Sequence, residues 1–546
     1  MTGRLLNKPK QASLFESLPV FKELISSMTT RIDHAHIQRE VADYYRYATF
    51  SHTWEDNEPL FDEVVHIVVY DLEQSFTRDK LHMFCKIARD AGFHWAWSDT
   101  CCINKSDHFV LQEALVAMFK WYEGSALTIV FLRGVRSPSQ RGDLARSIWN
   151  TRAWTFQEYH ASKVVRFYTE DWTPYMNLDI SNHKDCPEIT SEMEEAANAN
   201  VSALALKALR PGLEGIREKL CLASRRETTL VEDAAYSLLG IFAVSLPIVY
   251  GEGDQALGRL LAQLLTSSGD TSILAWTGKS GSFNSCLPGG ITVFSNLPHS
   301  YIPLAVTGAE MEPIRPKRRP SSPNLTLIMK LYDRLHELPV PSFANQRMKL
   351  PCLAFKLGPV LAARSGSAYV FRARTAALGI VEIRTTEDLS RLDSLTLVHP
   401  WIDFLLDRRR SVGTTETVPE NTNTQSLSTH DSPPSSGPSS ITRANGRART
   451  ARIISQIGRP FRVLAGDVDS LLSPSPLPLT EKRARALRFI ARLKQPFGAL
   501  LFTPTRQNVE EYRRVASESL ITVQVEELTS TVLNKLIEGA RTLDVL

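Results

Sequence analysis

A tryptophan followed four residues later by a glutamate is the first pattern in this sequence that could do chemistry. The segment reads "RAWTFQEY" (152–159) and contains Trp154 and Glu158. A carboxylate held rigidly in a ligand site can stabilise positive charge that develops on a substrate. The alternative is that Glu158 pairs with Arg152 or caps a helix, while Trp154 packs in the core. The residues alone leave both interpretations open.

Two further candidates follow short apolar segments. His52 ends "RYATFSH" (46–52), whose aromatic and β-branched residues predict a strand, and Asp99 ends the apolar run "WAWSD" (95–99). Ligands of parallel sheets bind in the crevice outside the carboxyl ends of the strands, where both residues would point. For Asp99 the alternative is the N-cap of the helix that follows it.

Most standard sites are excluded by the absence of their motifs. The sequence has no Walker-type phosphate loop, no GxSxG, no HExxH and no GxGxxG. Its seven cysteines are scattered without CxxC spacing, which argues against a zinc site and against a disulfide framework. We therefore expect no metal and no bound cofactor.

The elements that must position the candidate residues alternate between strand and helix over residues 44–175. Short apolar strands that alternate with amphipathic helices predict a mainly parallel sheet with flanking helices, an α/β fold. Residues 176–270 change to a helical pattern, with apolar stripes such as that in "LVEDAAYSLLGIF". Residues 1–43 precede these two parts as an N-terminal extension.

Strand patterns dominate residues 271–546, which predicts a β-rich C-terminal domain. The segments read as strands include "SILAW", "ITVF", "NLTLIMKLY" and "YVFRAR". Residues 411–445 are rich in Ser, Thr, Pro and Asn and have few apolar side chains. Such a segment cannot offset its ordering entropy by burial, so we expect a disordered insertion there.

The bulk properties fit a folded protein of several domains. The chain has 546 residues, of which 43% are hydrophobic and 22% charged. Its formal net charge of +4 is too small to indicate a nucleic-acid partner. No apolar run reaches the roughly 18 residues of a membrane span, and the N-terminus lacks the apolar core of a secretory signal. The expected compartment is the cytoplasm.

Four segments together resemble a known family. They are "RYATFSHTWEDNEPLF", "WAWSDTCCINKSDHFVLQEALVAMFKWYEGSALTIVFL", "SIWNTRAWTFQEYHASKVVRFYTEDW" and "LASRRETTLVEDAAYSLLGIFAVSLPIVYGEGDQALGRL". In this order they look like the blocks of the fungal heterokaryon-incompatibility (HET) domain, in proteins of the basidiomycete type, over roughly residues 44–265. The resemblance implies a trigger of programmed cell death after non-self recognition. In one departure, Glu55 stands where the family usually has Gly after "SHTW".

The resemblance also implies a reaction. The HET domain is similar to the Toll/interleukin-1 receptor (TIR) fold, and NAD-cleaving TIR proteins carry their catalytic glutamate in a Trp-x-x-x-Glu pattern like that of Trp154 and Glu158. Cleavage of the nicotinamide–ribose bond passes through an oxocarbenium-like state that a fixed carboxylate stabilises. The implied catalytic residue is Glu158, and the implied substrate-binding residues are His52, Trp54, Asp99 and Trp154. NAD would be the substrate and not a cofactor.

Two hypotheses of function follow. The first is an NAD glycohydrolase that is activated by self-association through the HET domain. The second is a non-enzymatic signalling or interaction module in incompatibility or defence, which recruits an unknown protein partner. A third outcome, loss of toxicity, is left open by Glu55. The feature that separates the first two is whether Glu158 opens into a pocket or is buried against Arg152.

Overall fold

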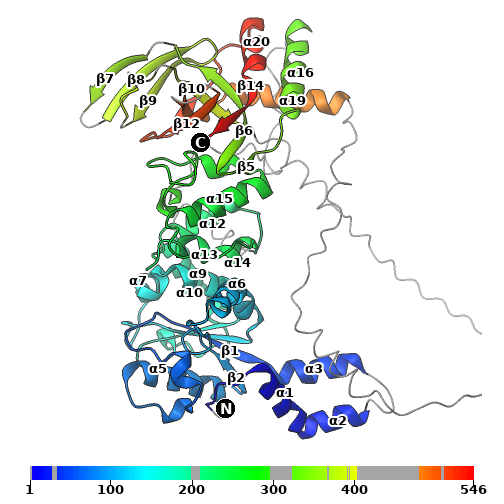
Figure 1. Ribbon diagram of the computed structural model, residues 1–546, viewed down its shortest axis with the longest axis vertical. Helices are drawn as coiled ribbons and strands as arrows, with labels where there is room; N and C mark the ends of the chain where they lie inside the picture. The colour runs from blue at the N-terminus through cyan, green and yellow to red at the C-terminus, as the bar shows by residue number, and fades with distance from the viewer. Residues whose placement is uncertain are drawn as a thin grey trace, which may run out of the picture. The chain divides into compact units, whose positions relative to one another are not determined.

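The computed structural model describes residues 3–27, 33–197, 210–295, 322–401 and 479–546, with short gaps at 359, 366–367, 386, 390–391, 393 and 506–509. The insertion expected at 411–445 lies outside the described residues. Within them the chain has an α/β first part, a helical middle and a β-rich last part, as the sequence predicted (Figure 1). No helix in these ranges is both long enough and apolar enough to cross a membrane.

A four-stranded parallel sheet forms the first part. Its strands are β1 (Tyr47–Ser51), β2 (Trp95–Trp97), β3 (Leu127–Phe131) and β4 (Val165–Tyr168), in the spatial order β2-β1-β3-β4. The register pairs Ala48 of β1 with Ala96 of β2 and with Leu127 of β3. Because β1 is followed by β2 on one side and β3 lies on the other, the strand order reverses between β1 and β3. Sheets of this type bind ligands at such a switch point.

Helices cover both faces of this sheet. On one face lies α5 (Phe76–Asp90), which begins at the N-cap Ser75 and packs Leu81 and Phe84 into a cluster with Phe50 of β1. On the other face lie α6 (His108–Gly124) and α9 (Ala153–Ala161), whose buried residues continue into the helical middle. Shorter or preceding elements of this part are α1 (Lys8–Ser17), α2 (Pro19–Ser27), α3 (His34–Tyr44), α4 (Phe61–Val64), η1 (Val69–Asp71), α7 (Asp143–Arg146) and α8 (Ile148–Thr151).

The middle of the chain is helical and shares one apolar core with α6. Its stripe in "LVEDAAYSLLGIF" does not form one continuous helix, because α13 ends at Tyr236 and α14 begins at Leu239. The close approach of α14 to α6 requires Gly240, since a Cβ there would lie 2.2 Å from the Cβ of Phe119. The elements are η2 (Tyr175–Asn177), η3 (His183–Asp185), α10 (Pro187–Ala197), α12 (Ile216–Ala223), α13 (Asp233–Tyr236), α14 (Leu239–Phe242) and α15 (Gln255–Ser268).

The last part is built on a seven-stranded mixed sheet and a three-stranded antiparallel sheet. The first contains β5 (Ser342–Ala344), β6 (Arg347–Lys356), β10 (Thr396–Pro400), β11 (Phe497–Pro504), β12 (Glu511–Val515), β13 (Ile521–Val523) and β14 (Ala540–Val545). The second contains β7 (Val360–Ser365), β8 (Ala368–Thr375) and β9 (Gly379–Thr385), and the helices are α16 (Ser322–His336), α19 (Leu479–Leu493) and α20 (Ser530–Gly539). Pairing is antiparallel except between β12 and β14.

Three segments that we read as strands are helical. "SILAW" and "ITVF" contain the short 3-10 helices η4 (Thr271–Leu274) and η5 (Ile291–Phe294), and "NLTLIMKLY" lies within α16. In α16 the buried residues Ile328, Leu331 and Leu335 are three and four positions apart, which is the period of a helix face. Because most residues of "NLTLIMKLY" are apolar, this helical spacing does not stand out in the sequence.

Candidate functional site

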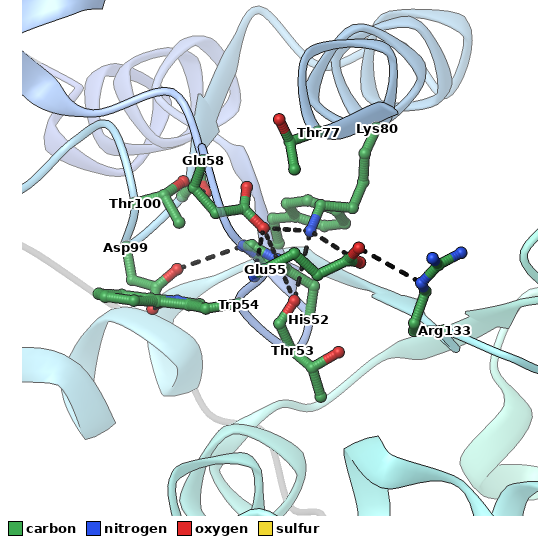
Figure 2. A network of polar contacts seen from close by, with 12 residues as sticks. His52, Thr53, Trp54, Glu55, Glu58, Thr77, Lys80, Asp99, Thr100 and Arg133 are labelled. Carbon is green, nitrogen blue, oxygen red and sulfur yellow. Dashed lines mark hydrogen bonds and ion pairs between the residues drawn. The ribbon is translucent and has the colours of Figure 1, made fainter. Parts of the chain in front are cut away.

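Side chains that follow the parallel strands form one network at the carboxyl edge of the sheet, and Figure 2 shows those of His52, Asp99 and Arg133. His52 follows β1, Asp99 lies two residues beyond β2, Arg133 two residues beyond β3, and Glu170 two residues beyond β4. Parallel strands end at the same edge, so residues far apart in the chain meet there. The structure thus brings His52 and Asp99 together at the edge that the sequence predicted.

His52 lies at the centre of this network. Its side chain is 1% exposed, and its ring stacks on Phe50 with 4.2 Å between the centroids. Nδ1 lies 3.2 Å from the carbonyl oxygen of Thr53 and 3.7 Å from a carboxylate oxygen of Glu58. Nε2 lies 3.5 Å from Oδ1 of Asp99. The imidazole is therefore held between two carboxylates, one on each side.

Asp99 joins His52 to an exposed tryptophan. The indole Nε1 of Trp54 donates a hydrogen bond of 2.7 Å to Oδ2 of Asp99, and the Nζ of Lys105 lies 3.5 Å from the centre of the Trp54 ring. Burial opposes ionisation of Asp99, but contacts with His52, Lys105 and Trp54 hold its pKa below the ordinary value. A network of this kind keeps a carboxylate charged beside an indole that is 48% exposed.

Asp99 does not cap the next helix, so that alternative was wrong. The N-cap of α6 is Asp107, whose carboxylate accepts a hydrogen bond of 2.9 Å from the backbone N–H of Phe109. The loop of eight residues between Asp99 and α6 explains the difference, because an N-cap must directly precede the first turn.

Lys80 brings a buried positive charge to the network from α5. Its side chain is 1% exposed, forms an ion pair with Glu58, and donates a hydrogen bond of 3.3 Å to the carbonyl of Thr53. Its Nζ also lies 3.7 Å from Oε1 of Glu55. Glu55 Oε2 in turn lies 3.3 Å from Nε of Arg133, whose Nη1 forms an ion pair of 2.5 Å with Glu170.

Glu55 occupies its position without a strained backbone. Its φ lies outside the left-handed region, so this position does not need Gly for positive φ. The consequence of Glu55 is chemical: a carboxylate stands between Lys80 and Arg133 where a Gly would leave space.

Glu158 is buried on α9, which covers the face of the sheet opposite α5. It is 4% exposed, and its Oε2 accepts a hydrogen bond of 2.5 Å from the hydroxyl of Ser51, the last residue of β1. The indole N–H of Trp149 donates to the same hydroxyl at 2.8 Å, so the proton of Ser51 is directed to Glu158. Burial and the nearby charge of Asp99 raise the pKa of Glu158 to about 8, although Ser51, Tyr122 and Arg226 act in the opposite direction.

Neither form of the structural alternative for Glu158 is found. Glu158 does not cap α9, because that helix begins at Ala153, and the guanidinium of Arg152 donates to the hydroxyl of Thr229 at 3.1 Å. The cation near Glu158 is Arg226 from the helical middle, whose pKa burial lowers to about 10 while Glu158 raises it. The carboxyl is thus buried, but not against Arg152.

Trp154 lies apart from the other candidates. It is half-buried against the apolar core and donates a hydrogen bond to Asp233, whose pKa burial raises. The structure therefore brings together His52, Trp54 and Asp99, of which Asp99 also interacts electrostatically with Glu158. Trp154 instead contacts Asp233.

Sequence reasoning missed four members of the network: Glu58, Lys80, Arg133 and Glu170. Arg133 and Glu170 could have been found, because each lies two residues beyond a strand of the parallel sheet. Lys80 lies on the buried face of α5, where a charged residue gives no signal of its partner in a single sequence. Among the described residues no three His, Cys, Asp or Glu side chains are grouped to hold a metal ion.

The buried carboxyl of Glu158 should make stability depend on pH. In the folded protein it keeps its proton up to about pH 8, whereas in the unfolded chain it loses it near the ordinary value of 4.5. Its contribution is therefore complete below pH 4.5 and is lost as pH rises toward 8. Between pH 5.5 and 8 we expect wild type to lose roughly 3 kcal/mol of unfolding free energy relative to Glu158→Gln. Urea unfolding at both pH values measures this, and parallel pH curves would contradict it.

Residues 47–142 match the family model described as "Heterokaryon incompatibility protein (HET)". This range contains His52, Trp54, Asp99 and Arg133 and ends before Glu158. The chain is 34% identical over 232 residues to "Vegetative incompatibility protein HET-E-1" of Podospora anserina, which covers 39% of this chain and 16% of that protein. The chain thus spans less than a fifth of that relative's length.

No solved structure matches the chain. The family match falls on the parallel sheet from β1 to the loop after β3, which positions most of the network described above. Residues 47–142 therefore match a HET domain, and the chain is similar over 232 residues to the Podospora anserina incompatibility protein.

Proposed function

We propose that this chain acts in vegetative, or heterokaryon, incompatibility as an effector of programmed cell death after non-self recognition. The support is the HET-domain match and the name of the Podospora relative. In this role the HET domain would be the active part. A change in its own association or a contact with another protein would start the response.

We further propose that the HET domain acts by TIR-like cleavage of NAD. The observation that carries this proposal is the position of Glu158: its carboxyl bonds Ser51, the last residue of β1, and lies within electrostatic reach of Asp99. The site lies at the carboxyl edge of a parallel sheet, where such folds bind nucleotides.

The reaction would break the bond between the ribose C1′ and the nicotinamide nitrogen. The electron pair of that bond leaves with nicotinamide as a neutral molecule, and a water molecule adds to the ribosyl cation with loss of a proton. Ionised Glu158 would stabilise the cation, and Asp99 would add a second negative charge. The positive pyridinium ring of bound NAD would lower the pKa of Glu158, which favours the ionised form that the reaction needs.

The experiment is NAD consumption by the purified full chain. Nicotinamide and ADP-ribose are quantified by chromatography at low and high protein concentration, because activation by self-association requires the higher one. Equal amounts of both products, with a rate per molecule that increases with concentration, would support the proposal. No product at any concentration, from a folded protein that self-associates, would exclude it.

The second candidate is a signalling module without catalysis. The observation that favours it is the enclosure of Glu158, which is 4% exposed and forms part of a chain of hydrogen bonds with Ser51 and Trp149. The exposed side chains of Trp54 and Phe109, at 48% and 84%, would then serve partner contact. Cell death on expression without any fall in cellular NAD would favour this candidate.

A further inference from the structure

The side chain of Glu55 is held in the network by two ion pairs. Its carboxylate lies between the ammonium group of Lys80 and the guanidinium group of Arg133 (Figure 2). Oε1 is buried and has no hydrogen-bond partner among the described residues, and its distance to Lys80 Nζ is 3.7 Å. Oε2 is 3.3 Å from Arg133 Nε. A buried oxygen without a hydrogen bond destabilises the folded state, so the side chain of Glu55 is held only weakly at this position.

Lys80 and Arg133 each have an N–H donor directed at the carboxylate of Glu55. Lys80 has three N–H donors, and Thr53 and Glu58 accept from two of them. Arg133 uses Nη1 for Glu170 and turns Nε toward Glu55, while its guanidinium stacks on Phe76 with 4.2 Å to the ring centre. The donors are therefore fixed by other contacts before any ligand arrives.

Glu55 is also the surplus negative charge of this part of the network. Lys80 is neutralised by Glu58, and Arg133 by Glu170. The side chain of Glu55 is 22% exposed, so it can leave toward solvent without crossing the core. Its departure exposes donors from both sides of the β1–β3 switch point, the place where open α/β sheets bind ligands.

We propose that Lys80 and Arg133 form a binding subsite for a phosphate group, and that the carboxylate of Glu55 fills this subsite when no ligand is bound. A phosphate presents three or more acceptor oxygens in a tetrahedral arrangement, so it can bond both cations, whereas the planar carboxylate of Glu55 stays 3.7 Å from Lys80 Nζ. This inference rests on the proposed function for its natural ligand, a dinucleotide with a diphosphate. Binding of inorganic phosphate tests the subsite without any cleavage.

The test compares phosphate binding by wild type and Glu55→Gln, measured by calorimetry and by the shift of the melting temperature. Gln keeps the size of the side chain but removes the charge that competes with the ligand. We expect Glu55→Gln to bind inorganic phosphate and diphosphate at least tenfold more tightly than wild type. Arg133→Gln, combined with Glu55→Gln, should lose that gain, because it removes one of the two donors.

The matched control is Glu63→Gln, which removes the same charge from a surface pair with Arg78 in the same domain. If the phosphate affinity of Glu63→Gln rises as much as that of Glu55→Gln, the gain comes from the change in net charge, and the proposed subsite is rejected. Equal phosphate affinity in wild type and Glu55→Gln also overturns the proposed subsite.

Competition experiments identify the natural ligand. Binding of NAD that competes with diphosphate identifies a dinucleotide, and phosphate binding without such competition identifies free phosphate. Phosphate binding in a protein that does not cleave NAD would keep the subsite and reject the reaction.

Discussion

Glu158→Gln is expected to reduce NAD cleavage at least 100-fold without unfolding the HET domain. Gln has the size of the protonated carboxyl, can accept the hydrogen bond of Ser51, and cannot ionise. Removal of one electrostatic stabiliser of a transition state typically costs about 3 kcal/mol or more. Because the pKa of Glu158 is about 8, the wild-type rate should also rise with pH through this range when NAD is below saturation.

The matched control is Glu192→Gln. Glu192 is also a buried glutamate, 1% exposed, but it bonds Tyr175 and the backbone of Ala145 away from the network. The control should keep wild-type activity per folded molecule. If Glu158→Gln cleaves NAD at the wild-type rate, Glu158 takes no part in the reaction. If Glu192→Gln loses as much activity as Glu158→Gln, both substitutions lower the activity by disturbing the fold.

Lys80→Met is expected to destabilise the protein by about 3–5 kcal/mol, the typical cost of leaving one buried charge unpaired. Lys80 is 1% exposed and neutralises Glu58, whose side chain is 5% exposed. The double variant Lys80→Met with Glu58→Gln should recover more than half of the loss, since it removes the orphaned carboxylate as well. Unfolding by urea, followed by tryptophan fluorescence, measures both free energies.

Lys120→Met is the control for loss of a lysine. Lys120 pairs with Glu123 at the surface and is 71% exposed, so its removal should cost less than about 1 kcal/mol. If Lys80→Met is as mild as this control, Lys80 is not the neutralising partner of Glu58. If the double variant is less stable than Lys80→Met alone, the two charges do not act as a pair.

The sequence predicted the sheet and its carboxyl edge because both follow from local patterns. The short apolar strands around Phe50 and Ile129 are bounded by polar loops, and parallel pairing then places His52 and Asp99 at one edge. The rule needs no knowledge of individual side-chain contacts. The strand prediction for "NLTLIMKLY" was wrong because it rested on the apolar content of the segment and not on the helical spacing of Ile328 and Leu331.

The protonation and burial of the candidate residues could not be predicted. Glu158 is enclosed by Ser51 on β1, by Tyr122 on α6 and by Arg226 on the helical middle, three elements that meet only in the tertiary fold. The same holds for Lys80, whose partner Glu58 lies 22 residues away in a loop. A single sequence gives the type of such a residue but not its neighbours.

The separation of strand partners along the chain has a consequence for the order of folding. The strands of the parallel sheet all lie within residues 47–168, whereas β6 pairs with the distant strand β14 through residues such as Leu350 and Leu543. At a synthesis rate of about 5–20 residues per second, the early sheet can form on the ribosome well before β14 emerges. The proposed death-inducing site would then be assembled in nascent chains, and any restraint that the β-rich part exerts would begin only after its last strand has docked.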